Sequence, residues 1–241
     1  MTTIVSAFIS NVNNRKDRTM EKYIEYGKLF LQTKVQKIIF IDELIFDKFN
    51  NFSNEFTYLI PIKKESIYLY EYKDLLTNFN LSSTSPEKDT LEYMFTMSSK
   101  TEWIKNAIEL NYFNSINFIW IDFGIRHMFK CDDNEFIKKI ENINKTLYKK
   151  IRIGSIWDLN RDFYEDIYKD IMWCFAGSVF GGDIKSLLIF SEKTKEMCIK
   201  IIQKKNTIMW EVNIWYLVYK ELPDLFDYYS CDHNSSLIDN Y

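Results

Sequence analysis

Short apolar runs alternate along this chain with longer stretches in which apolar residues recur at helical spacing. Residues 3–9 (TIVSAFI) and 37–41 (KIIFI) have the length and character of buried strands, whereas residues 20–31 carry a helical pattern. A strand, a helix and a second strand within so short a stretch predict a β-α-β unit. Such a unit implies parallel strands joined by a right-handed crossover.

The same two patterns continue through the rest of the chain. Further strands are predicted over residues 57–62, 116–121 and 151–156, and helices over residues 90–110, 134–149, 184–204 and 210–221. Residues 67–72 fit either a short strand or the start of a helix. Because no internal repeat and no linker interrupts this order, we expect one α/β domain spanning residues 1–241.

Composition and charge narrow the class of protein. Hydrophobic residues make up 46% of the chain and aromatic residues 17%, which is enough for a sizeable core. The net charge is −3, with acidic and basic residues interspersed, so the surplus of basic residues typical of a nucleic-acid-binding protein is missing and we expect no nucleic-acid partner.

Targeting and redox signals are weak. No apolar stretch approaches the roughly 20 residues that span a bilayer, so we expect no transmembrane segment, although peripheral membrane contact stays open. The four cysteines form no Cys-x-x-Cys pair and favour reduced thiols. We therefore expect a soluble, cytoplasmic protein.

Polar clusters follow three of the predicted strands: residues 10–18, Asp42-Glu43 and Asp122-Phe123-Gly124. In open α/β sheets, ligands bind beyond the carboxyl ends of the strands, so these clusters mark a candidate site. The Asp122 carboxylate is of the type that Mg²⁺ or Mn²⁺ prefers, and Gly124 would allow a sharp turn beside a ligand. The alternative is that Asp122 only caps the turn that follows.

Two later segments add candidates. The run AGSVFGG at residues 176–182 is suited either to placing bare backbone against a sugar or to forming a pair of tight turns, and it lacks the spacing of a phosphate-binding or dinucleotide loop. Glu211 stands beside Trp210 at a predicted helix start, where an acid either complements the helix dipole or acts on an acceptor hydroxyl. Of the two histidines, His127 and His233, the second lies in a polar patch and is the better ligand candidate.

Six blocks of sequence together resemble the HtrL/YibB family, which is taken to contain bacterial glycosyltransferases. The blocks are TIVSAFISN (3–11), IIFIDE (38–43), SSKTEWIKNAI (98–108), FNSINFIWIDFGIRH (113–127), AGSVFGG (176–182) and WEVNIWYLVYKELPDLFDYY (210–229). The similarity runs nearly from end to end. Its specific part is the combination of WIDFG, AGSVFGG and the late pattern of Trp210-Glu211 followed by Asp232-His233.

The resemblance implies a GT-A-like α/β domain with a mostly parallel central sheet flanked by helices. Its nucleotide-binding part would cover about residues 1–125 and its acceptor-side part about residues 126–241. The implied nucleotide contacts are Ser6, Ala7, Phe8 and Asn11 for the base and ribose, and Arg15 and Lys100 for the phosphates. The implied donor-sugar contacts are Gly181, Gly182 and Trp210, and the implied catalytic residues are Glu211 and Asp122.

The resemblance also implies a divalent cation, Mn²⁺ or Mg²⁺, held by Asp122 and His233. Asp122 falls where GT-A enzymes carry an Asp-x-Asp metal motif, but here Gly124 replaces the second Asp. A metal shell would therefore need water and phosphate oxygens, or the enzyme would work without a metal.

The function implied is transfer of a hexosyl or N-acetylhexosaminyl group. The donor would be a nucleotide diphosphate sugar, UDP-linked, and the acceptor a glycan or glycolipid of a cell or virion surface. This interpretation requires the Asp122 carboxylate and the loop after the first strand to face a common cleft.

Two alternatives stay open. A nucleotidyltransferase that makes the sugar nucleotide would have a similar sheet, but it would need a glycine-rich loop, and residues 10–18 contain no glycine. The other alternative is a non-catalytic glycan-binding protein. The donor sugar, the stereochemistry and the oligomeric state are not predicted.

Overall fold

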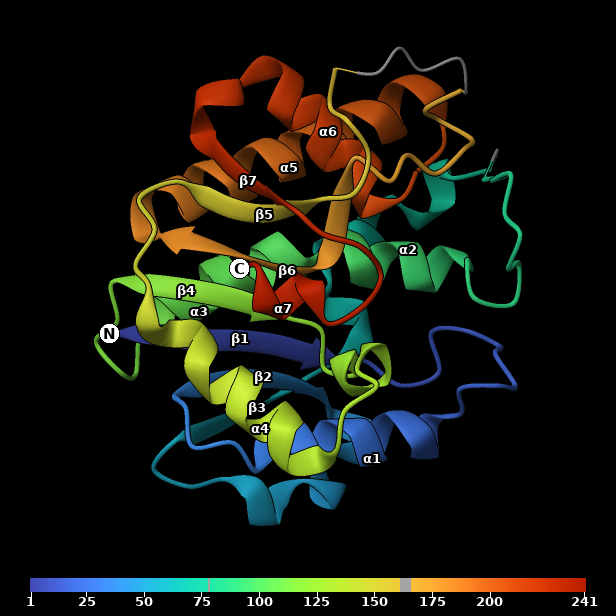
Figure 1. Ribbon diagram of the computed structural model, residues 1–241. Coiled ribbons are helices and arrows are strands. Elements are labelled where there is room, and N and C mark those ends of the chain that lie inside the picture. The colour runs from blue at the N-terminus through green and yellow to red at the C-terminus, as the bar shows by residue number, and fades with distance from the viewer. Residues whose placement is uncertain (78, 161–165) are drawn as a thin grey trace.

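A seven-stranded sheet forms the centre of the computed structural model, which describes residues 1–77, 79–160 and 166–241 (Figure 1). The strand order is β3-β2-β1-β4-β6-β5-β7. Six strands run parallel and β6 runs antiparallel to both of its neighbours. The strands are β1 (Thr2–Phe8), β2 (Lys37–Asp42), β3 (Thr57–Ile62), β4 (Asn117–Ile121), β5 (Ile151–Ser155), β6 (Phe175–Asp183) and β7 (Phe226–Ser230). The predicted α/β class with a mostly parallel sheet is confirmed.

Helices cover both faces of this sheet (Figure 1). They are α1 (Met20–Leu31), α2 (Leu91–Ser98), α3 (Lys100–Leu110), α4 (Asp133–Asn142), α5 (Ile184–Lys205), α6 (Glu211–Glu221) and α7 (Ser236–Asp239). One apolar core joins a face of the sheet to α2, α3, α5 and α6, and the other core joins the opposite face to α1, α4 and α7. Both cores are needed because a parallel sheet is apolar on both faces.

The central strand β1 shows how the sequence produces this layering. Ile4 and Val5 are both fully buried, and they belong to the two different cores because successive side chains of a strand point to opposite faces. Helix α1 begins at the predicted place because the Thr19 side chain accepts a hydrogen bond from the Lys22 N–H, which caps the first turn. The β-α-β unit predicted from the sequence is therefore present, with β1 and β2 parallel.

Several boundaries differ from the sequence-based expectation. The helix expected over residues 90–110 is two helices, α2 and α3, that meet at Ser99. Helix α4 ends at Asn142, before the expected limit of residue 149. The segment at residues 67–72 belongs to a 3₁₀ helix, Tyr68–Leu75. The end of the chain forms strand β7 of the sheet and helix α7. Phe226 and Tyr229 of β7 are buried.

The run at residues 176–182 requires the largest correction. It forms the interior of strand β6, paired on both sides with β4 and β5, and is neither a pair of tight turns nor an open loop. Its glycines allow close packing: a Cβ at Gly182 would lie 2.5 Å from the carbonyl oxygen of Lys150.

Among the residues that the structure describes, no helix combines the length and the apolar character needed to cross a membrane.

Candidate functional site

A cavity of about 810 Å³ opens where the parallel strands end. It is lined by Ala7 and Phe8 at the end of β1, by the loop that follows, by Asp122 directly after β4, and by Gly177 and Ser178 near the start of β6. Because β6 is antiparallel, its first residues lie at the edge where β1 and β4 end. The cavity has the size of a small-molecule site and stands at the carboxyl edge, where ligands of open α/β sheets bind.

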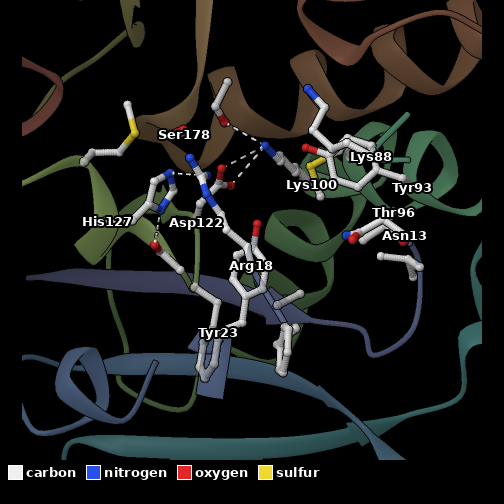
Figure 2. A pocket seen from close by; sticks show the side chains of 18 of the residues that line it. Asn13, Arg18, Tyr23, Lys88, Tyr93, Thr96, Lys100, Asp122, His127 and Ser178 are labelled. Atoms are coloured by element: carbon white, nitrogen blue, oxygen red, sulfur yellow. Dashed lines mark hydrogen bonds and ion pairs between the residues drawn. The ribbon is translucent and has the colours of Figure 1, made fainter. Parts of the chain in front are cut away.

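A buried lysine joins two carboxylates in this cavity, and Figure 2 shows it beside one of them, Asp122. The Lys100 Nζ lies 3.0 Å from Asp122 Oδ1 and 3.0 Å from Glu211 Oε1, and it donates a third hydrogen bond to the Gly177 carbonyl oxygen over 3.0 Å. The Lys100 side chain is only 1% exposed. Burial by itself would lower its pKa, but the carboxylates of Asp122 and Glu211 outweigh this effect and raise the pKa, so the ammonium stays charged.

The Asp122 carboxylate is held from two sides. The Trp120 indole N–H donates to Asp122 Oδ1 over 2.7 Å, while the Lys100 ammonium approaches both oxygens, at 3.0 and 3.3 Å. The alternative interpretation, in which the Asp122 side chain only caps the turn that follows, is wrong. The 3₁₀ turn Ile125–Met128 has no side-chain cap. The carboxylate keeps 29% of its surface exposed toward the cavity.

Gly177 makes room for this arrangement. A Cβ at this position would lie 2.6 Å from Glu211 Oε1 and 3.3 Å from Val212 Cγ1, closer than ordinary van der Waals contact. A larger residue at position 177 would displace the carboxylate of Glu211, which lies against the backbone of β6.

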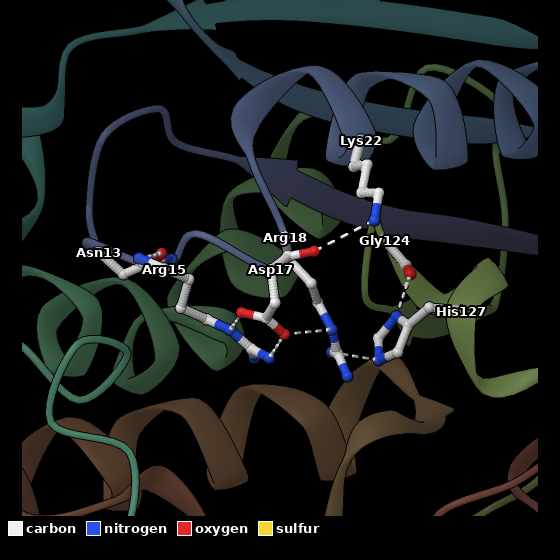
Figure 3. Close-up of polar contacts among 7 residues, drawn as sticks. All are labelled: Asn13, Arg15, Asp17, Arg18, Lys22, Gly124 and His127. Carbon is white, nitrogen blue, oxygen red and sulfur yellow. Dashed lines mark hydrogen bonds and ion pairs between the residues drawn. The ribbon is translucent and has the colours of Figure 1, made fainter.

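A histidine and an arginine form a second polar group across the cavity (Figure 3). The His127 Nδ1 lies 2.6 Å from the carbonyl oxygen of Gly124, which only accepts, and its Nε2 lies 2.7 Å from Nη1 of Arg18, which only donates. These partners assign the proton to Nδ1 and make the ring neutral. Burial lowers the pKa of His127, and the neighbouring Arg18 lowers it further.

The loop after β1 carries a second arginine beside the first (Figure 3). The Nε of Arg15 donates to Asp17 over 2.8 Å and a second guanidinium N–H donates to the other carboxylate oxygen, while Nε of Arg18 lies 3.9 Å from the same carboxylate. Hydrogen bonding to Arg15 lowers the pKa of Asp17 to about 2. Asp17 therefore holds the two guanidinium groups close together.

The lining of the cavity is basic although the whole chain is acidic. Among the described residues, five basic side chains and two carboxylates line it, in a chain of net charge −3. The basic residues are Arg15, Arg18, Lys88, Lys100 and Lys130, and the carboxylates are Asp122 and Glu211. This excess of positive charge favours an anionic ligand.

Aromatic side chains supply the apolar part of the walls. Trp103 and Trp120 stack with their ring centroids 5.8 Å apart, and the ring of His233 meets Trp173 edge-on at 4.3 Å. Tyr23 and Tyr93 also line the cavity, and Figure 2 shows their rings around the polar groups.

The structure brings most of the predicted site residues together. The predicted residues that line the cavity are Ala7, Phe8, Asn11, Arg15, Lys100, Asp122, Glu211 and His233. The Asp122 carboxylate and the loop after β1 therefore face one common cavity, as the sequence-based interpretation required.

Four predicted residues lie elsewhere. Ser6 is fully buried, and Trp210 is 3% exposed within the core beneath α6. Gly181 and Gly182 lie farther along β6, where Gly182 pairs with Phe118 in the first half of β4. Since a strand advances about 3.3 Å per residue, these glycines are more than 10 Å from the cavity edge at Gly177. None of the four is among the lining residues, whereas Gly177 and Ser178 of the same strand line the cavity.

Asp42, part of a predicted polar cluster, has a supporting position. Its Oδ2 accepts hydrogen bonds from the N–H of Ser10 over 3.0 Å and from the Ser10 hydroxyl over 2.5 Å. Asp42 therefore secures the start of the loop that carries the two arginines and does not line the cavity.

Sequence reasoning missed Arg18, His127 and Tyr93 as lining residues, and within the run 176–182 it chose Gly181 and Gly182 although Gly177 lines the cavity. Arg18 was within the polar loop already singled out, so its proximity to Arg15 was a usable signal. His127 was passed over in favour of His233, which lies in the more polar stretch of sequence. The positions of Tyr93 and Gly177 depend on how α2 and β6 pack, and no local pattern shows this.

The side chains around Asp122 do not fit a ready-made divalent-cation site. Both of its oxygens already face N–H donors, and the described residues contain no group of three or more His, Cys, Asp or Glu side chains placed to hold a metal. A cation bound at Asp122 would also be repelled by the Lys100 ammonium; two unit charges roughly 4 Å apart near a protein surface repel by about 4 kcal/mol. Binding of Mn²⁺ or Mg²⁺ stays a prediction.

Comparison with solved structures gives loose similarity over most of the chain. Mouse xyloside xylosyltransferase 1 has a TM-score of 0.45 at 7% identity, covering 96% of this chain and 86% of that one. The 4-diphosphocytidyl-2C-methyl-D-erythritol synthase of Anaerococcus prevotii has a TM-score of 0.42 at 8% identity, covering 95% and 85%. Structural similarity this loose does not indicate a function.

Comparison of the sequence with curated proteins finds no match. Comparison of the sequence with protein families does identify a family. Residues 1–236 match the family described as "Bacterial protein of unknown function (HtrL_YibB)", which spans nearly the whole chain and includes every residue that lines the cavity except Leu237. The chain therefore belongs to the HtrL_YibB family.

Proposed function

We propose that this protein is a glycosyltransferase that takes its sugar from a nucleotide diphosphate sugar bound in the cavity at the carboxyl edge of the sheet. The observation that carries the proposal is the charge of that cavity: besides Lys100, which is paired with both lining carboxylates, four further basic side chains line it in a chain of net charge −3. An anionic ligand of nucleotide-sugar size matches both the charge and the volume of about 810 Å³.

The donor is proposed to lie along the ends of β1 and β4. Ala7, Phe8 and Asn11 border the base and ribose, and a UDP-linked sugar is the donor class expected from the family resemblance. The diphosphate lies toward the basic loop with Arg15, since guanidinium groups bind phosphate oxygens through paired N–H donors. The sugar then lies toward Gly177 and Ser178.

In the reaction, the bond between the sugar C1 and the diphosphate oxygen breaks, and a bond forms between C1 and an acceptor hydroxyl oxygen. Negative charge gathers on the leaving diphosphate, where preorganised basic groups stabilise it. Glu211 is proposed to take the proton of the acceptor hydroxyl, directly in an inverting reaction. The acceptor is proposed to be a glycan or glycolipid.

The test is a thermal-shift screen of nucleotides and nucleotide sugars, followed by a transfer assay with those that raise the melting temperature. A ligand that binds the folded protein raises its apparent stability by mass action. Asp122→Asn should remove transfer while the protein stays folded, because the lining carboxylate held by Trp120 and Lys100 loses its charge. The matched control is Asp224→Asn, an exposed aspartate outside the cavity.

Other outcomes would replace the proposal. Pyrophosphate release from UTP and a sugar phosphate would instead identify a nucleotidyltransferase. Glycan binding in calorimetry, without binding of any nucleotide sugar, would identify a non-catalytic glycan-binding protein. Full transfer activity in a folded Asp122→Asn variant would show that the charge of Asp122 is not needed for transfer.

A further inference from the structure

The group formed by Lys100, Asp122 and Glu211 has the geometry of an occupied cation site. A single positive atom, Nζ, lies 3.0 Å from an oxygen of each carboxylate and 3.0 Å from a backbone carbonyl oxygen. An ammonium has three N–H donors, and these three contacts use all of them. With its side chain 1% exposed, Lys100 is fixed in place and is not a mobile phosphate ligand.

Positive charge that can reach a ligand lies instead on the loop between β1 and α1. Arg15 and Arg18 both line the cavity, and Asp17 holds them side by side (Figure 3). A guanidinium has five N–H donors. The hydrogen bonds recorded among the described residues use two of those of Arg15 and one of those of Arg18, so donors remain on both for an anion.

The loop is also anchored at several points, so its arginines are held in place before a ligand arrives. Ser10 is tied to Asp42, and the N–H of Asn14 donates to the carbonyl oxygen of Glu87 over 2.7 Å. His127 Nε2 orients Arg18 from the opposite wall. Preorganised donors lose little entropy on binding, which makes them effective anion ligands.

From these observations we propose that the protein binds a nucleoside diphosphate without a divalent cation: Lys100 takes the cation's place between the two carboxylates, and Arg15 and Arg18 together bind the diphosphate. This inference rests on the proposed function, because it concerns how the same cavity holds its donor.

The deciding experiment is calorimetric titration of UDP, with GDP, ADP and dTDP in parallel, in excess EDTA and again in Mn²⁺. We expect the same affinity for the bound nucleotide in both solutions. Arg15→Gln and Arg18→Gln should each weaken binding by about ten-fold or more, since each removes charge-assisted hydrogen bonds. Lys16→Gln is the matched control, because Lys16 belongs to the same loop but is exposed and does not line the cavity.

A second measurement examines Lys100 without any nucleotide. Titration of the unmodified protein with Mn²⁺, followed by the electron paramagnetic resonance signal of the free ion, should show no site at Asp122. Stoichiometric Mn²⁺ binding that Asp122→Asn abolishes would overturn the inference.

The failures are distinguishable. Nucleotide binding that requires Mn²⁺ would overturn the metal-free inference but leave the proposed glycosyltransferase standing. Equal losses in Arg15→Gln, Arg18→Gln and Lys16→Gln would show a general charge effect and remove the arginine assignment. If no nucleotide or nucleotide sugar binds in either solution, the proposed function fails together with the inference.

Discussion

The Lys100 ammonium lies 3.0 Å from Glu211 Oε1, although the two residues are 111 positions apart in the sequence. The contact joins the first turn of α3 to the first turn of α6 in the wall of the cavity. Because the same ammonium also holds Asp122, any change at Lys100 should affect the stability of the fold and the geometry of the site together.

Replacing Lys100 by Met should therefore destabilise the protein strongly. The variant leaves Glu211, 10% exposed, and Asp122 without their counter-charge, and breaking a buried ion pair costs about 3–5 kcal/mol. Urea denaturation of the variant and of the unmodified protein measures the loss. Adding Glu211→Gln to Lys100→Met should recover part of it, because one of the uncompensated charges is then absent.

The control for this prediction is Lys193→Met, which breaks an exposed ion pair with Glu196 on α5. Exposed pairs contribute little, so no measurable change is expected. A similar loss of stability in both variants would mean that the loss at Lys100 does not come from the burial of its ion pairs.

Gly177→Ala should impair the site through Glu211. The added Cβ would lie 2.6 Å from Glu211 Oε1, so the carboxylate must move away from Lys100. We expect transfer activity to fall while the circular dichroism spectrum stays unchanged, and we expect a loss of stability of about 1–3 kcal/mol from overpacking. The double variant Gly177→Ala/Glu211→Ala tests the cause. If the losses of stability in the two single variants simply add in the double variant, the clash does not act through Glu211.

The stability of the protein should fall as the pH drops below about 6.5, the ordinary pKa of histidine. His127 is buried and neutral, and its pKa is lowered in the folded protein, so the unfolded chain binds a proton first. The contribution is complete above pH 6.5 and is lost as the pH falls toward the lower folded pKa. Protonation of Nε2 would also place two positive groups, His127 and Arg18, in contact.

Proton NMR of the imidazole in a His233→Gln background follows this titration, because His127 is then the only histidine of the chain. The free energy of unfolding at pH 7.5 and 5.5, compared between this protein and a His127→Gln variant, measures the consequence. An imidazole that titrates at or above 6.5 would contradict the prediction.

Gly27→Ala should destabilise the packing of α1 on the sheet. A Cβ at Gly27 would fall 1.8 Å from the ring of Phe123, which is itself buried and stacked on Phe8. Because the ring would have to move out of its stack with Phe8, we expect a loss of about 1–3 kcal/mol despite the better helix propensity of alanine. Thermal denaturation measures it, with Lys28→Ala on the exposed side of the same helix as the control. An unchanged melting temperature would show that Phe123 repacks freely.

The success of sequence reasoning depended on the range of the interactions involved. The strands β1, β2 and β4 were predicted well because each is a continuous apolar run that must be buried on both faces. Strand β6 was not, because its glycines suggest turns locally, and only pairing with β4 and β5 makes an extended strand of them. Trp210 was assigned to a sugar for a similar reason, since an aromatic residue is equally suited to a ligand and to a core.

By itself, the sequence determined the α/β class, the β-α-β start and the polar ends of β1 and β4, because these follow from the local spacing of apolar residues. Tertiary structure decided which polar groups meet: Lys100 with Asp122 and Glu211, and Arg18 with His127. Lys100 meets partners 22 and 111 residues away only through the packing of α3, α6 and β6, and Arg18 meets His127, 109 residues away, because β1 and β4 are neighbours in the sheet. No local pattern encodes either arrangement.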